Sequence, residues 1–272
     1  MKREMSEYWR HPRFHDLGLL KARFTRHRYD LHTHPTYVIA LITEGCERVR
    51  IGRQVAIAPV GAILVVNPEE PHDGEAGVEG GWAYRTFYPS VPLLTAVAGE
   101  LGRDRAPLFP RGLIEDRDLA EAMLAAHVGS TDEDAASAET SMLLALRRLI
   151  LRHGDWGGWP ERREGAGSRR RLALYGQAIE RDLTATLDLQ RFADAAGVTR
   201  FQVIRDFKKA SGLTPAAFIR NRRLRCAERL IEQGASLADA AFEAGFSDQS
   251  HLSRTFRALR GITPGTFREA QH

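Results

Sequence analysis

Three histidines early in the chain have the chemistry to bind a metal ion or a small polar molecule. His32 and His34 are two residues apart, so in a strand both side chains lie on one face. A small β-barrel could bring His72 beside them, and three neutral imidazoles can bind a first-row metal ion. The same set could instead line a pocket for an organic effector, or only fasten the barrel mouth. The residues alone leave all three interpretations open.

Aromatic side chains would extend such a site for a small polar or anionic ligand. Trp82 and Tyr84 alternate with Arg85 on one predicted strand, so Arg85 must face the opposite side. At least one of these three must therefore miss a shared pocket, and an aromatic strand face can also be ordinary core. The predicted ligand-binding residues are His32, His34, Tyr37, His72, Trp82 and Tyr84.

The C-terminal part of the chain contains a repeat with helix-turn-helix character. A helix-turn-helix needs a small residue where its helices meet and a glycine in the turn for a left-handed backbone. Ala193 and Gly197 supply these, and Ala241 and Gly245 supply them again 48 positions later. A Gly-x-Thr-Pro-x-x-Phe segment follows each copy. Two such units would let one chain read two neighbouring half-sites on DNA.

The second helix of each unit carries polar residues suited to reading bases. Arg can contact guanine O6 and N7, Gln can pair with adenine, and an aromatic ring can touch the thymine methyl group. Val203, Ile204 and Phe207 give the first of these helices an apolar side, as Leu252 and Phe256 do in the second. The predicted DNA-binding residues are Arg200, Phe201, Gln202, Arg205, Lys208, Lys209, Gln249, Ser250, His251 and Arg254.

These residues need a run of helices to position them. The predicted helices cover Arg171–Leu183, Leu189–Ala196, Thr199–Ser211, Thr214–Gln233, Leu237–Ala244 and Asp248–Arg260, with a last short one opening at Thr263 and Pro264. Thr214 caps the long helix, Pro215 takes its first position and Gly234 ends it. Its 20 residues span about 30 Å, near the ~34 Å repeat of B-DNA.

The N-terminal part is predicted to be a small antiparallel barrel or sandwich between Lys21 and Tyr88. Its strand runs are Tyr37–Ile42, Glu47–Ile51, Ala62–Asn67 and Trp82–Tyr88, with Gly45 among the turn residues between them. Helical patterns follow at Leu93–Leu101, Asp118–Val128 and Ala138–Arg152. The apolar stripe of the last of these could pack on the barrel or on a second subunit. Residues 154–168 read as a linker between domains 1–153 and 169–272.

Composition and charge narrow the class of protein. A chain of 272 residues that is 43% hydrophobic and 27% charged is ordinary for a folded globular protein. Residues 169–272 hold 18 Lys and Arg against 11 Asp and Glu, net +7, while the rest has net −3. Such an excess favours nucleic acid through counterion release. The absence of a signal core or a long apolar run predicts a cytoplasmic location, and Cys46 and Cys226 are predicted to be reduced thiols.

Residues 186–268 resemble the DNA-binding domain of AraC-type transcription regulators. The resemblance is carried by the run Ala241–Phe256 and by Gly261–Arg268. It implies two helix-turn-helix units joined by a long helix. The first copy departs more, because Asp206 sits beside the expected Phe207; an acid there should pair with an arginine or point away from DNA.

Residues 20–90 resemble the cupin-type sensor domain of such regulators, through His32-Thr33-His34, Gly45 and the segment Asn67–His72. The carboxylate that metal cupins place after the second histidine is missing, since Thr36 to Ile39 stand there. This counts against a metal cofactor and against catalysis. The expected fold is therefore an all-β cupin-like barrel followed by helices, and then an all-α domain with two helix-turn-helix units.

The predicted function is a sequence-specific transcription regulator, not an enzyme, controlled by a small-molecule effector in the β domain. Its expected partners are promoter DNA, the effector, a second copy of the chain and RNA polymerase. Two alternatives stay open at this point: a metal-dependent cupin enzyme fused to a DNA-binding domain, and a ligand-independent architectural DNA binder.

Overall fold

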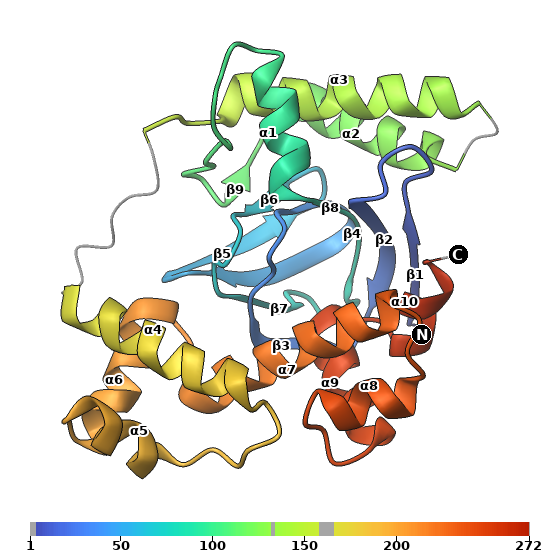
Figure 1. The fold of residues 1–272 in the computed structure, drawn as a ribbon. Coiled ribbons are helices and arrows are strands. Elements are labelled where there is room, and N and C mark those ends of the chain that lie inside the picture. Colours follow the sequence, from blue (N-terminus) through green and yellow to red (C-terminus); the bar gives the residue numbers. More distant parts are fainter. Residues whose placement is uncertain (1–3, 132–133, 158–165, 272) are drawn as a thin grey trace. The chain divides into compact units, whose positions relative to one another are not determined.

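The computed structural model describes residues 4–131, 134–157 and 166–271, which form a β-rich unit and a helical unit (Figure 1). The strands of the β-rich unit are β1 Met5–Arg10, β2 Leu17–Phe24, β3 Arg28–His32, β4 Val38–Ile51, β5 Gln54–Pro59, β6 Ile63–Val66, β7 His72–Ala76, β8 Trp82–Pro89 and β9 Leu113–Ile114. Its helices are α1 Val91–Gly99, α2 Arg117–Gly129 and α3 Ala135–His153.

Strand β4 is shared by the two halves of a bent antiparallel sheet. Its first part pairs with β6 and β8, and its second part pairs with β5 and β7. A bulge between Ile42 and Glu44 and a left-handed Gly45 (φ 65°) make the bend. A Cβ at position 45 would collide with the carbonyl oxygen of Gly81. The predicted turn at Gly45 is therefore wrong: the glycine bends one continuous strand and does not end it.

The two halves of the sheet face each other across an interior of side chains. The hydroxyl groups of Tyr29 on β3 and Tyr84 on β8 are 2.5 Å apart, although these strands belong to different halves. His34 also stacks on Tyr88 of β8 at a centroid distance of 5.3 Å. Contacts of this kind make the sheet barrel-like and give it an inner face.

The opposite face of the sheet is covered by α1, α2 and α3, as Figure 1 shows. Leu19, Ile39 and Phe87 point to this side and pack in one core with Leu94 and Met142 of the helices. Each of these side chains is completely buried. The predicted helices were correct in place, and α2 begins with the Asp116 side chain accepting the backbone N–H of Leu119.

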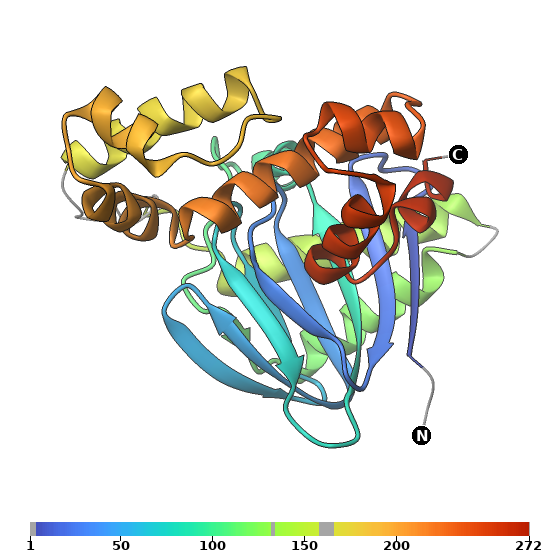
Figure 2. The same ribbon diagram turned by 90° about the horizontal axis from the view of Figure 1, so that it is seen from below.

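The helical unit contains α4 Ala166–Arg181, α5 Leu189–Ala196, α6 Arg200–Ser211, α7 Pro215–Glu232, α8 Leu237–Glu243, α9 Gln249–Arg260 and α10 Pro264–Glu269. Figure 2 shows α7 running between the α5–α6 pair and the α8–α9 pair. Gly197 (φ 64°) ends α5, and Gly245 (φ 82°) occupies the turn after α8, so both adopt the left-handed backbone. The predicted double helix-turn-helix is confirmed.

Both ends of the stretch predicted as a linker, 154–168, belong to folded units. Asp155 and Leu108 exchange two backbone hydrogen bonds of 2.7 and 3.0 Å, which joins residues 154–157 to the β-rich unit. Ala166 already belongs to α4, and residues 158–165 lie outside the described part of the chain. No helix among the described residues is long and apolar enough to cross a bilayer. Cys46 and Cys226 are both free thiols.

Candidate DNA interface and ligand site

The three predicted histidines gather at one point of the β-rich unit. One ring nitrogen from each of His32, His34 and His72 lies within 4.8 Å of the others, and all three side chains are buried. We expected His32 and His34 to align on one face of a single strand, and this expectation is wrong. His32 ends β3 and His34 lies in the loop that follows it.

Hydrogen bonds fix the loop that leads to His72, the first residue of β7. Asn67 donates to the carbonyl of Phe109 and accepts from its N–H, both at 2.9 Å. Glu69 donates its N–H to the carbonyl of His34 at 2.8 Å and adopts a positive φ of 61°. A non-glycine residue with positive φ is uncommon and persists only where its surroundings hold it. The backbone of His34 and the loop leading to His72 are thus locked together.

Trp82 and Tyr84 form an aromatic wall on the inner face of the sheet. Their rings stack at a centroid distance of 6.1 Å with 13° between planes, and Phe24 packs against both. Burial raises the pKa of Tyr84 well above its ordinary value, and the neighbouring Tyr29 raises it further. The indole N–H of Trp82 is buried with no hydrogen-bond acceptor among the described residues.

Glu47 is an interior acid that sequence reasoning missed. It is 7% exposed and its carboxyl group lies directly over Gly74, where any side chain would displace it. Burial, with a smaller contribution from Asp73, raises the pKa of Glu47 to about 8. The carboxyl group is therefore mostly protonated at neutral pH and can donate a hydrogen bond. The bulge in β4 changes which residues of the strand face the interior, and this change places Glu47 inside. The bulge is not visible in the sequence pattern.

Tyr37 and Arg85 belong to the helix-covered face and stay apart from this wall. The Tyr37 hydroxyl donates to the carbonyl of Pro107 at 2.7 Å, and its ring meets Phe109 edge-on. Arg85 lies 3.0 Å from Nδ1 of His127 on α2. Arg85 thus faces away from Trp82 and Tyr84, as strand alternation predicted, and Tyr37 packs as core.

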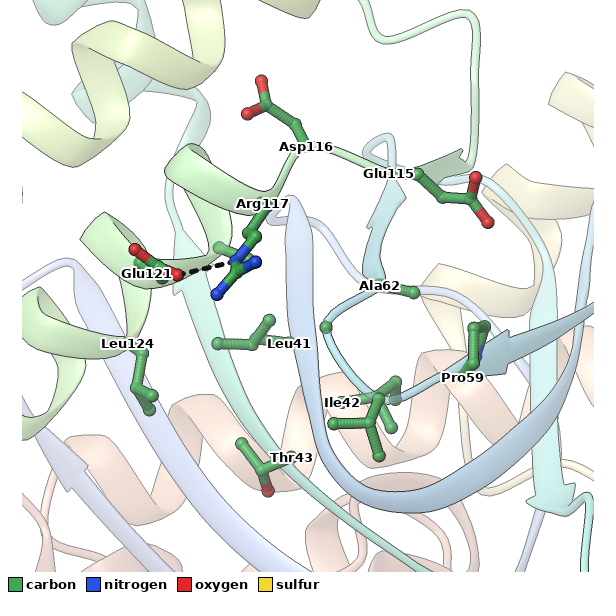
Figure 3. Close-up of a pocket in the computed structure, with 13 residues that line it drawn as sticks. Leu41, Ile42, Thr43, Pro59, Ala62, Glu115, Asp116, Arg117, Glu121 and Leu124 are labelled. Carbon is green, nitrogen blue, oxygen red and sulfur yellow. Dashed lines mark hydrogen bonds and ion pairs between the residues drawn. The ribbon is translucent and has the colours of Figure 1, made fainter.

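A hollow lies on the outside of the β-rich unit, between α2 and the turn from β5 to β6 (Figure 3). Its volume is about 600 Å³. Leu41, Ile42 and Leu124 form part of an apolar floor, and Arg117 and Glu121 form an ion pair of 3.0 Å beside it. This groove contains none of the predicted ligand residues.

Helix α6 presents most of its predicted DNA-binding residues to solvent. Its first turn is held by Thr199, which accepts the N–H of Gln202. Phe201 is 78% exposed, which is unusual for a large apolar side chain. The other exposed residues of the predicted set on this helix are Arg200, Arg205, Lys208 and Lys209. Gln202 is half-buried and hydrogen-bonds both Arg205 and Asp206 at 2.8 Å.

Helix α9 repeats this arrangement. Asp248 caps it by accepting the N–H of His251 at 2.7 Å, and Gln249, Ser250 and Arg254 are exposed. His251 is half-buried and meets Phe246 edge-on at 5.1 Å, so its ring is partly occupied in packing. Phe242 on α8 is 79% exposed and was not among the predicted residues. The exposure of Phe242 could have been predicted from the sequence, because the neighbouring alanines supply the buried side of α8.

Asp206 points away from the exposed side of α6 and forms a buried ion pair. Its side chain is fully buried and accepts hydrogen bonds from Arg171 on α4 at 2.6 and 2.8 Å. Ser168 donates a further bond of 2.8 Å. Burial raises the pKa of Asp206, but the bonds from Arg171, Ser168 and Gln202 outweigh it and hold the pKa below its usual value. The expectation that this acid pairs with an arginine is confirmed.

Two family models match this chain, one over the β-rich unit with the histidines and one over the helices with the DNA-binding residues. Residues 14–149 match the AraC-like ligand binding domain, and residues 192–270 match a helix-turn-helix domain. The chain belongs to the AraC family of transcription regulators. It is a transcription regulator with an N-terminal ligand-binding domain and a C-terminal DNA-binding domain.

Individual relatives agree with this assignment. YbfI of Bacillus subtilis, described as an uncharacterized HTH-type transcriptional regulator, is 25% identical over 230 residues, 83% of this chain and 82% of YbfI. The activator RhaR of Cronobacter sakazakii is 26% identical over 180 residues, 65% of this chain and 62% of RhaR.

Solved structures of ToxT from Vibrio cholerae share the fold. An apo ToxT variant aligns with a TM-score of 0.56 at 9% identity, over 94% of this chain and 98% of ToxT. ToxT bound to an unsaturated fatty acid aligns with a TM-score of 0.53 at 10% identity, over 98% and 97%. At this identity the likeness concerns the fold alone.

Proposed function

We propose that α6 and α9 are the helices that read promoter DNA, one in each of two neighbouring half-sites. The observation that supports this most is the repeated design of the two helices. Each begins at a polar cap and exposes its first turn, with Arg200 and Phe201 in α6 and Gln249 and Ser250 in α9. In helix-turn-helix proteins the N-terminal residues of the recognition helix contact base edges.

Specific roles follow from side-chain chemistry. Arg205 and Arg254 read bases, because a guanidinium can bind guanine O6 and N7 with two hydrogen bonds. Lys208 or Lys209, at the other end of α6, holds a phosphate and fixes the register of the helix on the duplex. Phe201 contacts a thymine methyl group. Gln202 is oriented for its role by the hydrogen bond to Asp206.

The experiment is a selection of bound sequences from a random duplex pool, at salt high enough to suppress phosphate-only binding. The full chain should enrich a motif with two blocks about one helical turn apart. Arg205→Ala and Arg254→Ala should each weaken the base preference in a different block of the motif. Arg111→Ala, which removes an exposed positive charge from the β-rich unit, is the matched control. Enrichment of one block, or of none, would contradict paired reading.

The effector site that we propose is the inner face of the sheet, beside Trp82, Tyr84 and Glu47. Two stacked rings offer a flat apolar surface, the orphan Trp82 N–H offers a donor, and the protonated Glu47 offers another. These groups suit a small uncharged organic molecule with a flat face and at least two hydrogen-bond acceptors. His32, His34 and His72 belong to the same interior, whereas Tyr37 is left out because it packs on the helix side.

This effector site can be tested by fluorescence, because Trp82 lies within it. Candidate metabolites that shift the DNA-binding midpoint should quench the wild-type protein, and Trp82→Phe should abolish that quenching and weaken the DNA response. Thr43→Ala, in the outer groove of Figure 3, is the matched control. If the effect of the ligand on DNA binding were lost in Thr43→Ala and kept in Trp82→Phe, the effector site would be the outer groove.

We propose further that the protein acts in the cytoplasm as a homodimer and contacts RNA polymerase. Leu144 and Leu151 lie seven residues apart on α3 and are each 57% exposed. Leu124 and Val128 add exposed apolar surface on α2. Helices paired through residues seven apart are a common dimer interface. A regulator bound at a promoter stands beside RNA polymerase, which makes the polymerase its natural protein partner.

A further inference from the structure

We propose that His32, His34 and His72 bind one divalent first-row metal ion, with zinc as the reference ion. One ring nitrogen from each of these residues lies within 4.8 Å of the others. All three side chains are buried, at 3%, 7% and 7% exposure. Three imidazoles at one point form a common protein site for such ions.

Backbone carbonyls set the ring orientation of two of these histidines. Nδ1 of His32 lies 2.7 Å from the carbonyl oxygen of Asp30, and Nδ1 of His72 lies 2.9 Å from that of Glu70. A carbonyl can only accept, so Nδ1 carries the proton in both rings. In a neutral ring of this tautomer Nε2 carries the lone pair, and a histidine binds a metal ion through such a lone pair. Metal-binding histidines typically donate their other N–H in this manner.

The segments that carry the histidines are also fixed relative to each other. The N–H of Glu69 donates to the His34 carbonyl at 2.8 Å, and Gly52 donates to the Pro71 carbonyl at 2.8 Å. The rings of His34 and His72 stack at a centroid distance of 5.3 Å and 23°. A site held by backbone hydrogen bonds loses little conformational entropy when the ion binds.

The spacing fits an ion after a small closure. Zn–N bonds of about 2.0–2.1 Å at tetrahedral angles put ligand nitrogens about 3.3 Å apart. The nitrogens in the present structure, within 4.8 Å of one another, need to approach by at most about 1.5 Å. Three protein ligands leave a fourth position open, and water or an oxygen of the effector would fill it.

The test uses the full chain, stripped of metal with a chelator and dialysed. Co²⁺ is the probe, because its visible spectrum reports the number and geometry of its ligands, and Zn²⁺ is then measured by competition. We expect one equivalent of Co²⁺ per chain. His34→Gln and His72→Gln should each weaken binding by about 100-fold or more. His15→Gln changes an exposed histidine and should bind as the wild type does.

X-ray absorption on the zinc-loaded wild-type protein gives a test that does not depend on any variant folding. Three nitrogen donors at about 2.0 Å with imidazole scattering would support the site. A sulfur donor at about 2.3 Å would place the ion on a cysteine and overturn it. Absence of Co²⁺ and Zn²⁺ binding at micromolar concentration, or unchanged binding in His72→Gln, would also overturn it. No DNA is involved, so such a failure leaves the regulator function standing.

Discussion

Arg171→Met should destabilise the helical unit by about 3–5 kcal/mol, because it leaves a buried carboxylate without its cation. The Asp206 side chain is 0% exposed and accepts two hydrogen bonds from Arg171, at 2.6 and 2.8 Å. Ser168 and Gln202 remain as neutral donors at 2.8 Å, so the loss should fall near the lower end of that range. Arg170→Met, on the same helix and exposed, should change stability by less than about 0.5 kcal/mol.

A double variant separates the unpaired charge from lost packing. Asp206→Asn added to Arg171→Met removes the buried charge but keeps a group of similar shape, so it should recover part of the loss. The pH dependence has a definite sign. The pKa of Asp206 is held below its ordinary value of 3.8, so the ion pair stabilises the folded state above that pH. This stability disappears as pH falls through the lower folded-state pKa.

Urea unfolding followed by two signals assigns the effect to the correct unit. All four tryptophans, at positions 9, 82, 156 and 159, come before α4 in the sequence, so indole fluorescence reports mainly the part of the chain ahead of the helical unit. Circular dichroism at 222 nm reports helices in both. The variant should shift the dichroism transition and leave the fluorescence midpoint in place. A shift below about 1 kcal/mol, or one shared by both signals, would refute the argument.

Three further outcomes are expected. Lys209→Gln should lower DNA affinity uniformly across sequences and reduce the slope of log K against log salt by about 1, as measured by anisotropy titrations; a sequence-dependent loss would show that Lys209 reads bases. Because burial raises the pKa of Glu47 to about 8, the folded protein should lose stability as pH rises from about 4.5 to 8. Glu47→Gln should remove that dependence from the melting temperature. Burial and Arg85 lower the pKa of His127 to about 3, so wild-type stability should fall as pH drops below 6.5, and His127→Gln should flatten this part of the curve.

The helix-turn-helix part was predictable because its signals are local. Thr199, Thr214 and Asp248 accept backbone N–H groups of the first turn just after them, and Gly197 and Gly212 end helices with positive φ. Each signal involves residues within a few positions of one another. The predicted bounds of α5 to α9 therefore lie within one residue of the observed ones, whereas α4 begins five residues before its predicted start.

The strands of the β-rich unit were harder, because sheet pairing joins distant segments. Strand β1 lies before the predicted β region, and β7, with the sequence His-Asp-Gly-Glu-Ala, has no apolar alternation. Gly45 looks like a turn residue in sequence, yet its left-handed backbone only bends β4. The close approach of Gly81 that demands a glycine there comes from a segment far along the chain.

The class of protein follows from local features of the chain, because residue spacing indicates the double helix-turn-helix and composition gives its basic charge. Tertiary structure alone decided which side chains share an environment. It placed Tyr37 among the helices, buried Glu47 against Gly74, gave Asp206 the cation of Arg171, and brought His72 to His32 and His34. The physical reason is that burial and pairing depend on long-range packing, where a one-residue bulge reverses the face that a side chain occupies.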